Sequence, residues 1–291
     1  LSIRRQRQMC IRDRGNTMDG GLYDSSETGW QAYKTTKDYI KALHDAGYNT
    51  VRIPVTWGSH INDDYTIDEA WINRVQEIVD YCVDQDMYAI VNIHHDGAAN
   101  HDDRGNNTPA CWLDTYSQNI EKVYQKYEGV WNTIANRFKD YDEHVIFESM
   151  NEVTDAHGTA TNEDDAVLNA LNQLFINTVR ATGSNNTKRW LAITGRFATT
   201  AAITTMPEDT LADSGDLGTT RLMFAVHIYK SNNNVRWSYD DLKQWQSSMS
   251  SSYKNVGNLD SNMPIYVGEY GVRTKAQNGS ATGYNNAERA L

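Results

Sequence analysis

The amino-acid sequence of 291 residues predicts an α/β fold, a (β/α)8 TIM barrel. Short β-rich runs alternate with longer segments in which apolar residues recur at helical spacing. The predicted strands are almost continuously apolar, which is typical of a parallel sheet covered by helices. An open doubly wound sheet usually carries a glycine-rich phosphate loop, but the sequence has no GxGxxG or GxxxxGK motif. A barrel has no such requirement and needs about 250 residues, so it is favoured.

Each predicted strand is a short run rich in β-branched and aromatic residues, as in YNTVRIP at 48–54. Strands of this kind are predicted, in chain order, at 48–54, 86–93, 144–150, 189–194, 221–227 and 264–269. A seventh strand is expected to be cut off before Gly15.

The helices between these strands are predicted from apolar residues three and four positions apart. In the segment 67–85, for example, Trp71, Val75 and Ile78 share one face. Gly47 follows the first helix as its C-cap. Helices are predicted in this way at 33–46, 67–85, 116–139, 164–182 and 239–252.

The composition excludes several classes of protein. A hydrophobic fraction of 39% is adequate for a core, and no run of 18 apolar residues predicts a membrane span. The net charge of −11 argues against a nucleic-acid partner, which favours clustered Lys and Arg. Cys10, Cys82 and Cys111 form no CxxC motif, so no thiolate metal site is predicted. Cys82 is predicted to be a small core residue, and a Cys82–Cys111 disulfide stays open.

Residues 1–14, LSIRRQRQMCIRDR, differ from the rest of the chain. They carry a net charge of +4, whereas residues 15–291 carry −15. A basic arm for nucleic acid is one interpretation. We favour another, in which this segment resembles translated adapter sequence and is not native. The domain is therefore placed at 15–291.

Polar side chains stand at the C-terminal end of one predicted strand after another. These residues are Arg52, His94, His95, Asp96, Asn151, Glu152, His227, Tyr229 and Glu269. Catalytic residues of (β/α)8 barrels lie at these strand ends. The agreement among these strand ends therefore predicts an active site there.

Two of these residues, Glu152 and Glu269, are carboxylates on different strands. Glycoside cleavage needs such a pair, because one group protonates the leaving oxygen while the other acts at the anomeric carbon. Arg52 could hold one carboxylate ionised, and His227 and Tyr229 could hold the other. Different surroundings would give the two carboxylates different roles.

Other interpretations of the same residues stay open. A Glu at a strand end is often a solvated loop residue, and Glu148 is interpreted as a structural, hydrogen-bonded barrel residue. His94, His95 and His227 could hold the metal of a hydrolase, although adjacent strand residues point to opposite faces. A third alternative is a barrel that binds glycans without cleaving them.

Several stretches of the sequence resemble the family 5 glycoside hydrolases, the cellulase family of retaining (β/α)8 endo-glycanases in clan A. They follow the family's order over about 220 residues: RIPVTWGSHI (52–61), VNIHHD (91–96), IFESMNE (146–152), VHIY (226–229) and IYVGEYG (265–271). GNTMDGG (15–21) is similar to the end of its first-strand motif. The endoglucanase and xyloglucanase branch is the most similar one.

The resemblance implies roles for the two carboxylates. Glu152 would be the general acid/base and Glu269 the nucleophile of a double displacement with retention. Their carboxyl groups would then lie about 5–5.5 Å apart. No metal and no cofactor would be required.

The resemblance also implies a set of residues around this pair. Arg52 and Tyr229 would position the nucleophile, and His227 would support the acid/base. Asn151 would bind the 2-hydroxyl of the sugar, and His94 would complete the site.

A polysaccharide needs an open cleft, in which flat rings stack on sugar faces. The residues predicted to bind substrate in this cleft are Asn16, Trp57, His60, His95, Trp112 and Trp237. The preferred substrate is a β-1,4-glucan, namely cellulose, xyloglucan or mixed-linkage glucan. Mannan and xylan stay open, because the fold does not settle the substrate.

The sequence departs from the family's pattern in three places. Val153 stands where Pro is usual, and residues 1–14 replace the start of the first strand. Only 22 residues follow Glu269, so the eighth βα unit is expected to be missing and the chain to be poorly soluble or weakly active. Relatives are typically secreted, which implies an extracellular protein. We expect a monomer whose partner is a plant-type β-glucan polysaccharide, with neither a nucleic-acid nor a membrane partner.

Overall fold

The computed structural model describes residues 11–13, 18, 26–28, 33–97, 112–115, 119–153, 162–199, 207–213, 221–230, 247 and 263–272. Seven parallel strands form one sheet in the order β1-β2-β3-β4-β5-β6-β7. Their bounds are β1 Ile11–Asp13, β2 Thr50–Ile53, β3 Tyr88–Asn92, β4 Val145–Glu148, β5 Leu191–Ile193, β6 Leu222–Lys230 and β7 Ile265–Val272. Each strand thus pairs with the strand that precedes it in the sequence.

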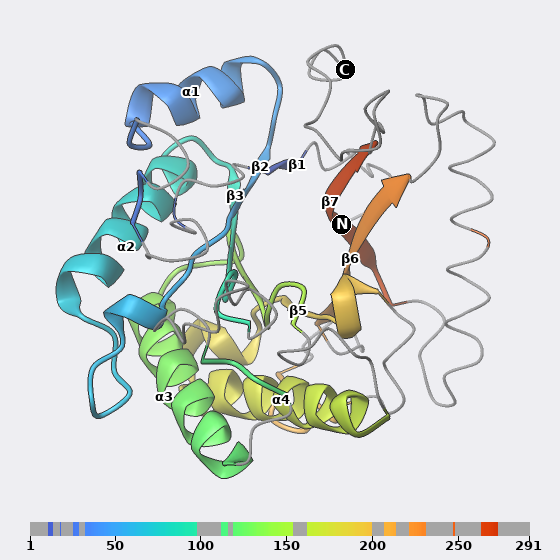
Figure 1. Ribbon diagram of the computed structural model, residues 1–291. Coiled ribbons are helices and arrows are strands. Elements are labelled where there is room, and N and C mark those ends of the chain that lie inside the picture. The colour runs from blue at the N-terminus through green and yellow to red at the C-terminus, as the bar shows by residue number, and fades with distance from the viewer. Residues whose placement is uncertain are drawn as a thin grey trace, which may run out of the picture.

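This strand order confirms the predicted barrel rather than a doubly wound sheet. A doubly wound sheet reverses its order at a switch point, where helices change from one face to the other. Here the order of the described strands never reverses, and right-handed crossovers therefore place the described helices on the same, outer face. The first and last strands, β1 and β7, also contact each other, so the sheet curves back on itself (Figure 1).

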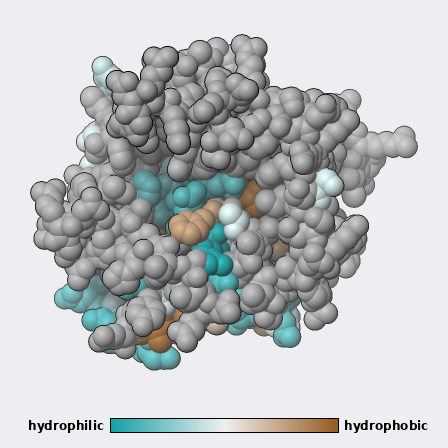
Figure 2. Space-filling view, turned by 45° about the vertical axis from the view of Figure 1, so that its right-hand side comes forward, coloured by the Kyte–Doolittle hydropathy of each residue, from teal (hydrophilic) through white to brown (hydrophobic). Residues whose placement is uncertain are grey.

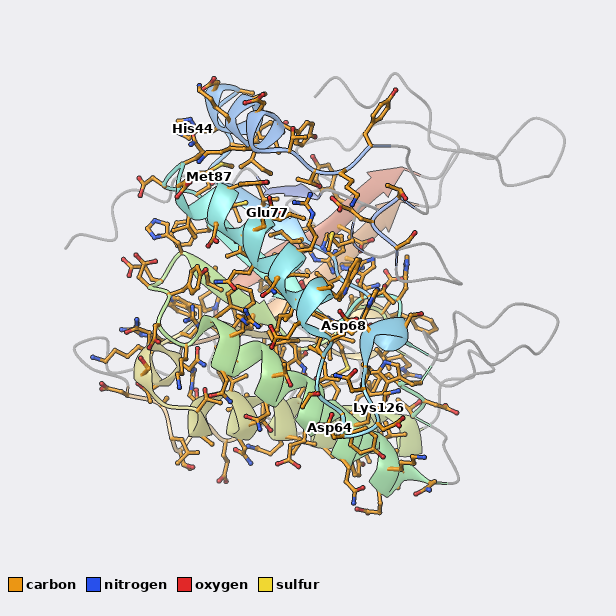
Figure 3. The ribbon with its side chains drawn as sticks, turned by 90° about the vertical axis from the view of Figure 1, so that its left-hand side faces the viewer. His44, Asp64, Asp68, Glu77, Met87 and Lys126 are labelled. Atoms are coloured by element: carbon orange, nitrogen blue, oxygen red, sulfur yellow. The ribbon has the colours of Figure 1, made fainter. Side chains whose placement is uncertain are left out.

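The helices cover the outside of the sheet. Their bounds are α1 Lys37–Asp45, α2 Glu69–Val83, α3 Ile120–Phe138 and α4 Asn162–Ala181. Thr36 and Asp68 cap α1 and α2 by accepting hydrogen bonds from backbone N–H groups of the first turn. In Figure 3, α2 lies between the labelled residues Asp68, which caps its start, and Met87, which follows its end and precedes β3. None of the helices in the described part of the chain is long and apolar enough to cross a membrane.

Alternation along the strands divides the core into two layers. The larger layer lies between the sheet and the helices, where Val51, Phe147 and Trp131 are fully buried. The smaller layer fills the inside of the barrel and consists of Ile90, Ile146, Ala192, Met223, Ala225 and Tyr266. Two positions beyond Ile90 and Ile146, the inward residues are the polar Asn92 and Glu148. The inside of the barrel is therefore apolar at one level and polar at the next, toward the C-terminal strand ends.

A buried arginine joins α3 to the start of β4. Arg189 is 2% exposed and donates hydrogen bonds to the backbone carbonyls of Phe138, Tyr141, Asp142 and Val145 at 2.6–3.0 Å. One of these carbonyls, that of Phe138, is the last of α3 and has no partner within the helix. Arg189 therefore caps the helix and holds the turn that leads into β4.

The elements differ from the predicted ones mainly at their ends. The strands are shorter than predicted, except that β6 and β7 each extend three residues further. The first helix begins at Lys37 because Thr36 caps it, and Gly47 follows it with a φ of 93°, as predicted. Cys82 is a buried free thiol, as predicted for a core residue, and burial raises its pKa to about 12. The helix predicted at 239–252 lies outside the described residues except for residue 247.

The first strand comes from the segment that we set aside on its composition. Ile11–Asp13 pairs in parallel with β2, with Asp13 opposite Arg52. These three residues therefore take the place of the barrel's first strand. The idea that residues 1–14 are not native to the domain concerns their origin, and it stays a prediction.

Candidate active site

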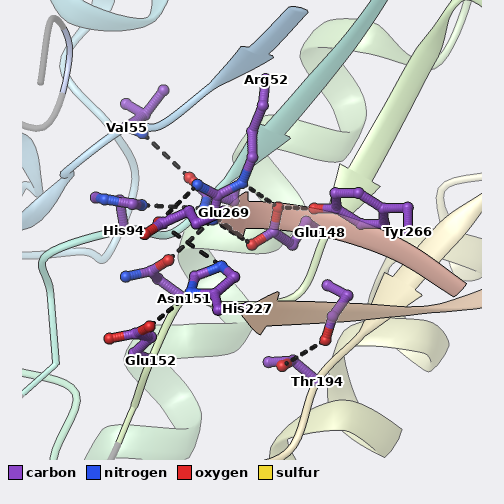
Figure 4. A network of polar contacts seen from close by, with 12 residues as sticks. Arg52, Val55, His94, Glu148, Asn151, Glu152, Thr194, His227, Tyr266 and Glu269 are labelled. Atoms are coloured by element: carbon purple, nitrogen blue, oxygen red, sulfur yellow. Dashed lines mark hydrogen bonds and ion pairs between the residues drawn. The ribbon is translucent and has the colours of Figure 1, made fainter. Parts of the chain in front are cut away.

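Five strands bring polar side chains together at one end of the barrel (Figure 4). Arg52 lies in β2, His94 follows β3, and Asn151 and Glu152 follow β4. His227 and Glu269 lie in β6 and β7. A recess in the molecular surface has mainly hydrophilic residues on its described floor (Figure 2). The predicted gathering of strand-end residues is thus present.

The two carboxylates lie on either side of His227. The His227 Nδ1 atom is 2.6 Å from Glu152 Oε1, and its Nε2 atom is 3.6 Å from Glu269 Oε1. One oxygen of each carboxylate and one nitrogen of the ring all lie within 4.8 Å of one another. This spacing is close to the ~5–5.5 Å of retaining glycosidases and shorter than the ~6.5–9.5 Å of inverting ones.

A β-bulge turns Glu269 toward this site. Val226 pairs with Val267, but the next residue, His227, pairs with Glu269, so Gly268 is an extra residue in β7. Tyr266 points into the barrel, and strict alternation would point Glu269 outward. The extra residue reverses the alternation, and both carboxylates therefore face the same space.

Arg52 is fully buried and connects three of the site's side chains. Its Nη1 donates to Glu269 Oε1 at 3.0 Å, and its Nη2 donates to Asn151 Oδ1 at 2.8 Å. Glu148 accepts from Nε at 2.8 Å and from Nη2 at 2.7 Å. Burial alone would lower the pKa of Arg52, but the charge and hydrogen bonds of Glu148 outweigh it and raise this pKa. Arg52 therefore stays charged and holds Glu269 in place.

The hydrogen bond from Arg52 also fixes the side-chain amide of Asn151. A guanidinium only donates, so the Asn151 oxygen must face it and the nitrogen must point the other way. The Asn151 backbone N–H donates to the carbonyl of Ile93 at 2.8 Å, which ties this residue to the end of β3. The amide nitrogen is thereby turned away from Arg52 as a hydrogen-bond donor.

His94 and His95 are uncharged in this structure at neutral pH. Burial lowers the pKa of His94 well below its usual value, and the charge of Arg52 adds to this effect. Burial lowers the pKa of His95 to about 4. The Asn92 amide nitrogen donates to His94 Nδ1 at 3.3 Å, so the proton of His94 lies on Nε2.

Glu148 confirms the interpretation of a structural, hydrogen-bonded residue. Its carboxylate is 1% exposed and accepts hydrogen bonds from Arg52, from Asn92 at 3.1 Å and from the Tyr266 hydroxyl. Burial raises its pKa, but the charge of Arg52 and the hydrogen bonds outweigh this effect, so the pKa is lowered.

One group of three side chains in the described part of the chain has its carboxylate and imidazole atoms close enough to share a cation: Glu152, His227 and Glu269. The group predicted from the sequence, His94 and His95 with His227, is not brought together in this way. Arg52 already places a positive charge 3.0 Å from Glu269, which opposes a second cation there. The arrangement suits acid–base and nucleophilic chemistry better than metal chemistry.

Comparison with known proteins agrees with this geometry. Residues 13–290 match the model of the family described as Cellulase (glycosyl hydrolase family 5). The chain belongs to this family. It is therefore a glycoside hydrolase, and the predicted family, fold class and enzyme class are confirmed.

The chain is also similar to individual members of family 5. It is 34% identical over 278 residues to endoglucanase A of Ruminococcus albus, covering 91% of this chain and 72% of that protein. It is 35% identical to the cellulase/esterase CelE of Acetivibrio thermocellus, covering 90% of this chain but only 31% of that longer protein. A solved structure of a family 5 xyloglucanase from Paenibacillus pabuli superposes with a TM-score of 0.75 and 31% identity, covering 90% and 79% of the two chains.

The structure corrects one of the predicted substrate-binding residues of this family 5 enzyme. Trp57 is 0% exposed, and its indole N–H donates to the Asn92 carbonyl at 2.9 Å. Its ring fills the core between the sheet and the helices and offers no face to a sugar. The position after Pro54 indicated a loop, but the backbone N–H of Trp57 binds the Asp96 carboxylate, which turns the ring inward.

The other predicted substrate-binding residues have different surroundings. Trp112 is half-buried, donates from its indole to Asp96 at 2.7 Å and has Lys126 over its ring. His60 stacks on Trp71 with ring centroids 4.0 Å apart and contacts Asp68, at the rim of a cavity of about 620 Å³. Asn16 and Trp237 lie outside the described residues, as does the side chain of Tyr229. These residues stay candidates.

The sequence interpretation missed how several residues support the site. Asn92 donates to both Glu148 and His94, and the backbone N–H of Val55 donates to its side-chain oxygen. Asn92 stands two positions before His94, so period-two alternation along β3 could have found it. Nothing in the sequence linked Tyr266 to Glu148, because they are 118 positions apart.

Proposed function

We propose that the chain is a retaining endo-β-1,4-glucanase that cleaves cellulose, xyloglucan or mixed-linkage glucan by double displacement. The observation that carries this proposal is the placement of Glu152 and Glu269, whose oxygens and a His227 nitrogen lie within 4.8 Å of one another. Family 5 membership supports the class of reaction. The endoglucanases and the xyloglucanase among its relatives support the class of polymer.

In the first step, a Glu269 carboxylate oxygen attacks the anomeric carbon of the sugar. The glycosidic C–O bond breaks, and the Glu152 carboxyl proton passes to the leaving oxygen, which departs as a free hydroxyl. Arg52 holds Glu269 through the 3.0 Å hydrogen bond, and its positive charge favours the carboxylate form that attacks. His227 contacts Glu152 at 2.6 Å and orients it toward the leaving group.

In the second step, a water molecule cleaves the glycosyl ester. Glu152, now a carboxylate, takes one proton from this water, and the oxygen attacks the anomeric carbon from the side that the leaving group vacated. The bond to Glu269 breaks, and its carboxylate is restored. The Asn151 amide nitrogen, turned away from Arg52, is placed to donate to the 2-hydroxyl of the sugar.

The open surroundings of the acid/base suit a polymer. The Glu152 side chain is 36% exposed and that of Glu269 is 16% exposed, so the nucleophile lies deeper. We infer that Trp112 contributes a ring at the rim of the cleft, since Asp96 holds its indole in place. We also propose that the enzyme acts outside the cell, where such polymers occur.

The test is reducing-sugar release from carboxymethylcellulose, xyloglucan, xylan and mannan. The variant Glu269→Ala is compared with the unchanged protein and with the exposed control Glu143→Gln. We expect glucan hydrolysis that Glu269→Ala abolishes and Glu143→Gln retains. Preference for mannan or xylan would change the proposed substrate but keep the proposed reaction. Binding without hydrolysis by a folded protein would contradict the proposal.

A further inference from the structure

Glu148 makes more contacts to the catalytic machinery than a structural residue needs. It receives two hydrogen bonds from Arg52, one from Asn92 and one from Tyr266, and it is fully enclosed. The two bonds from Arg52 come from neighbouring nitrogens in a fork, which fixes the plane of the guanidinium. The direction of Nη1, the atom that holds Glu269, is therefore set by Glu148.

The positive charge of Arg52 lies beside two negative charges. Arg52 contacts two carboxylates, that of Glu148, whose side chain is 1% exposed, and that of Glu269, whose side chain is 16% exposed. If Glu269 were the single carboxylate partner of this buried positive charge, the charge would bind Glu269 tightly and make its carboxylate a weaker base. With Glu148 present, one negative charge already neutralises the guanidinium, so Glu269 keeps part of its basicity.

We propose that Glu148 is a positioning residue for the nucleophile: it fixes the plane of Arg52, offsets its charge, and is itself held by Tyr266. The inference rests on the proposed role of Glu269. It assigns to Glu148 a function in the reaction besides its contribution to stability. Tyr266 contributes by its hydroxyl, which reaches Glu148 from β7, the strand that carries Glu269 (Figure 4).

The charge can be separated from the position by three substitutions. Glu148→Gln keeps the length of the side chain and removes the charge, and its amide nitrogen cannot accept one of the two hydrogen bonds from Arg52. Glu148→Asp keeps the charge and shortens the side chain by one methylene. Tyr266→Phe keeps the charge and the length of Glu148 and removes one hydrogen bond. The exposed Glu143→Gln serves as the matched control for the loss of a carboxylate.

The measurement is the pH dependence of kcat/KM on a soluble glucan, with kcat at the optimum. In Glu148→Gln the uncompensated charge of Arg52 makes Glu269 easier to ionise. We expect its acid limb to move down by about one pH unit and its kcat to fall by about 100-fold or more, because the guanidinium is misplaced. Glu269 also faces His227 of β6, Glu152 after β4 and His95 after β3, and all three are unchanged in every variant.

Glu148→Asp and Tyr266→Phe disturb the position of Arg52 and not the charge beside it, so both should lower kcat and leave the acid limb where it is. We expect the kcat of Glu148→Asp to fall by about 10-fold or more. If Glu148 were purely structural, replacing it would lower the melting temperature but leave the acid limb and the kcat of the folded fraction unchanged. This result would overturn the inference. If Glu148→Gln does not fold, Glu148→Asp decides, because an unchanged kcat in that variant contradicts positioning. Glu269→Ala distinguishes this failure from a failure of the proposed function. Full activity of that variant would show that Glu269 is not the nucleophile, whatever the role of Glu148.

Discussion

Glu152 and Glu269 differ in the partners that their carboxylates have. Glu152 contacts His227 and is 36% exposed, whereas Glu269 contacts the buried Arg52 and is 16% exposed. A neighbouring arginine favours the ionised form of a carboxylate, which is the form that acts as a nucleophile. A neighbouring histidine and access to solvent instead allow a carboxyl group to release and take up a proton. Local surroundings and family membership both support the proposed assignment of acid/base and nucleophile.

The acid/base assignment predicts how Glu152→Ala depends on the leaving group. Removing a general acid costs about 10²–10⁴-fold, but an activated aryl leaving group needs no proton. We expect kcat to fall by about this factor on a glucan and much less in the glycosylation of an aryl cellobioside. Added azide should restore turnover and give a β-glycosyl azide. Equal loss on both substrates would contradict the assignment.

Gly268 is predicted to be needed at the bulge of β7. A Cβ atom there would lie 3.1 Å from His227 Nε2 and 3.3 Å from its Cδ2. Gly268→Ala should therefore shift the ring between the two carboxylates and lower kcat by about 10- to 100-fold, with little effect on the melting temperature. Steady-state kinetics with a thermal melt tests this, and an unchanged kcat would show that the ring position is not critical.

Asp96 joins the ends of β2 and β3 to Trp112. Its carboxylate is fully buried and accepts hydrogen bonds from the Trp57 backbone and the Trp112 indole. Burial raises its pKa from 3.8 to about 7, although these hydrogen bonds oppose the shift. The folded state thus binds a proton that the unfolded state has lost, and stability falls as this proton leaves.

The variant Asp96→Asn cannot ionise, so its stability should lack the pH dependence that Asp96 gives the unchanged protein. The stabilisation by protonated Asp96 is fully present below about pH 4 and is lost as the pH rises through about 7. We expect the free energy of unfolding of the unchanged protein, relative to the variant, to fall across this window by on the order of 4 kcal/mol. Urea denaturation from about pH 4 to about pH 8 measures it, and a difference independent of pH would contradict the burial of an ionisable Asp96.

Arg189 is predicted to stabilise the connection between α3 and β4. Arg189→Met would remove one donor from each of four backbone carbonyls, of which those of Phe138 and Asp142 keep a backbone N–H partner, and the free energy of unfolding should fall by about 3–5 kcal/mol. Lys188→Met is the neighbouring control, because its ion pair with Asp213 is about half exposed and should matter by less than about 1 kcal/mol. Equal effects in denaturant titrations would contradict the capping role of Arg189.

At the scale of the whole molecule, the strand order and the position of the site follow from the sequence pattern. Apolar runs ending in Arg52, Asn151 and Glu152 predicted the barrel, and the structure brings these ends together. The bulge at Gly268 was not predictable, because strict alternation from Tyr266 would turn Glu269 outward. Trp57 was misplaced for a similar reason: the carboxylate that turns it inward lies 39 positions away.

The central claim is that Glu269 becomes covalently attached to the sugar. The most direct test is to incubate the protein with an activated 2-deoxy-2-fluoro-β-cellobioside, which forms the glycosyl ester and delays its hydrolysis. Peptide mass spectrometry then locates the label. We predict one cellobiosyl adduct on the peptide that carries Glu269, and none in Glu269→Ala. A label on Glu152 or elsewhere, or turnover without an adduct and with inversion at the anomeric carbon, would contradict the account.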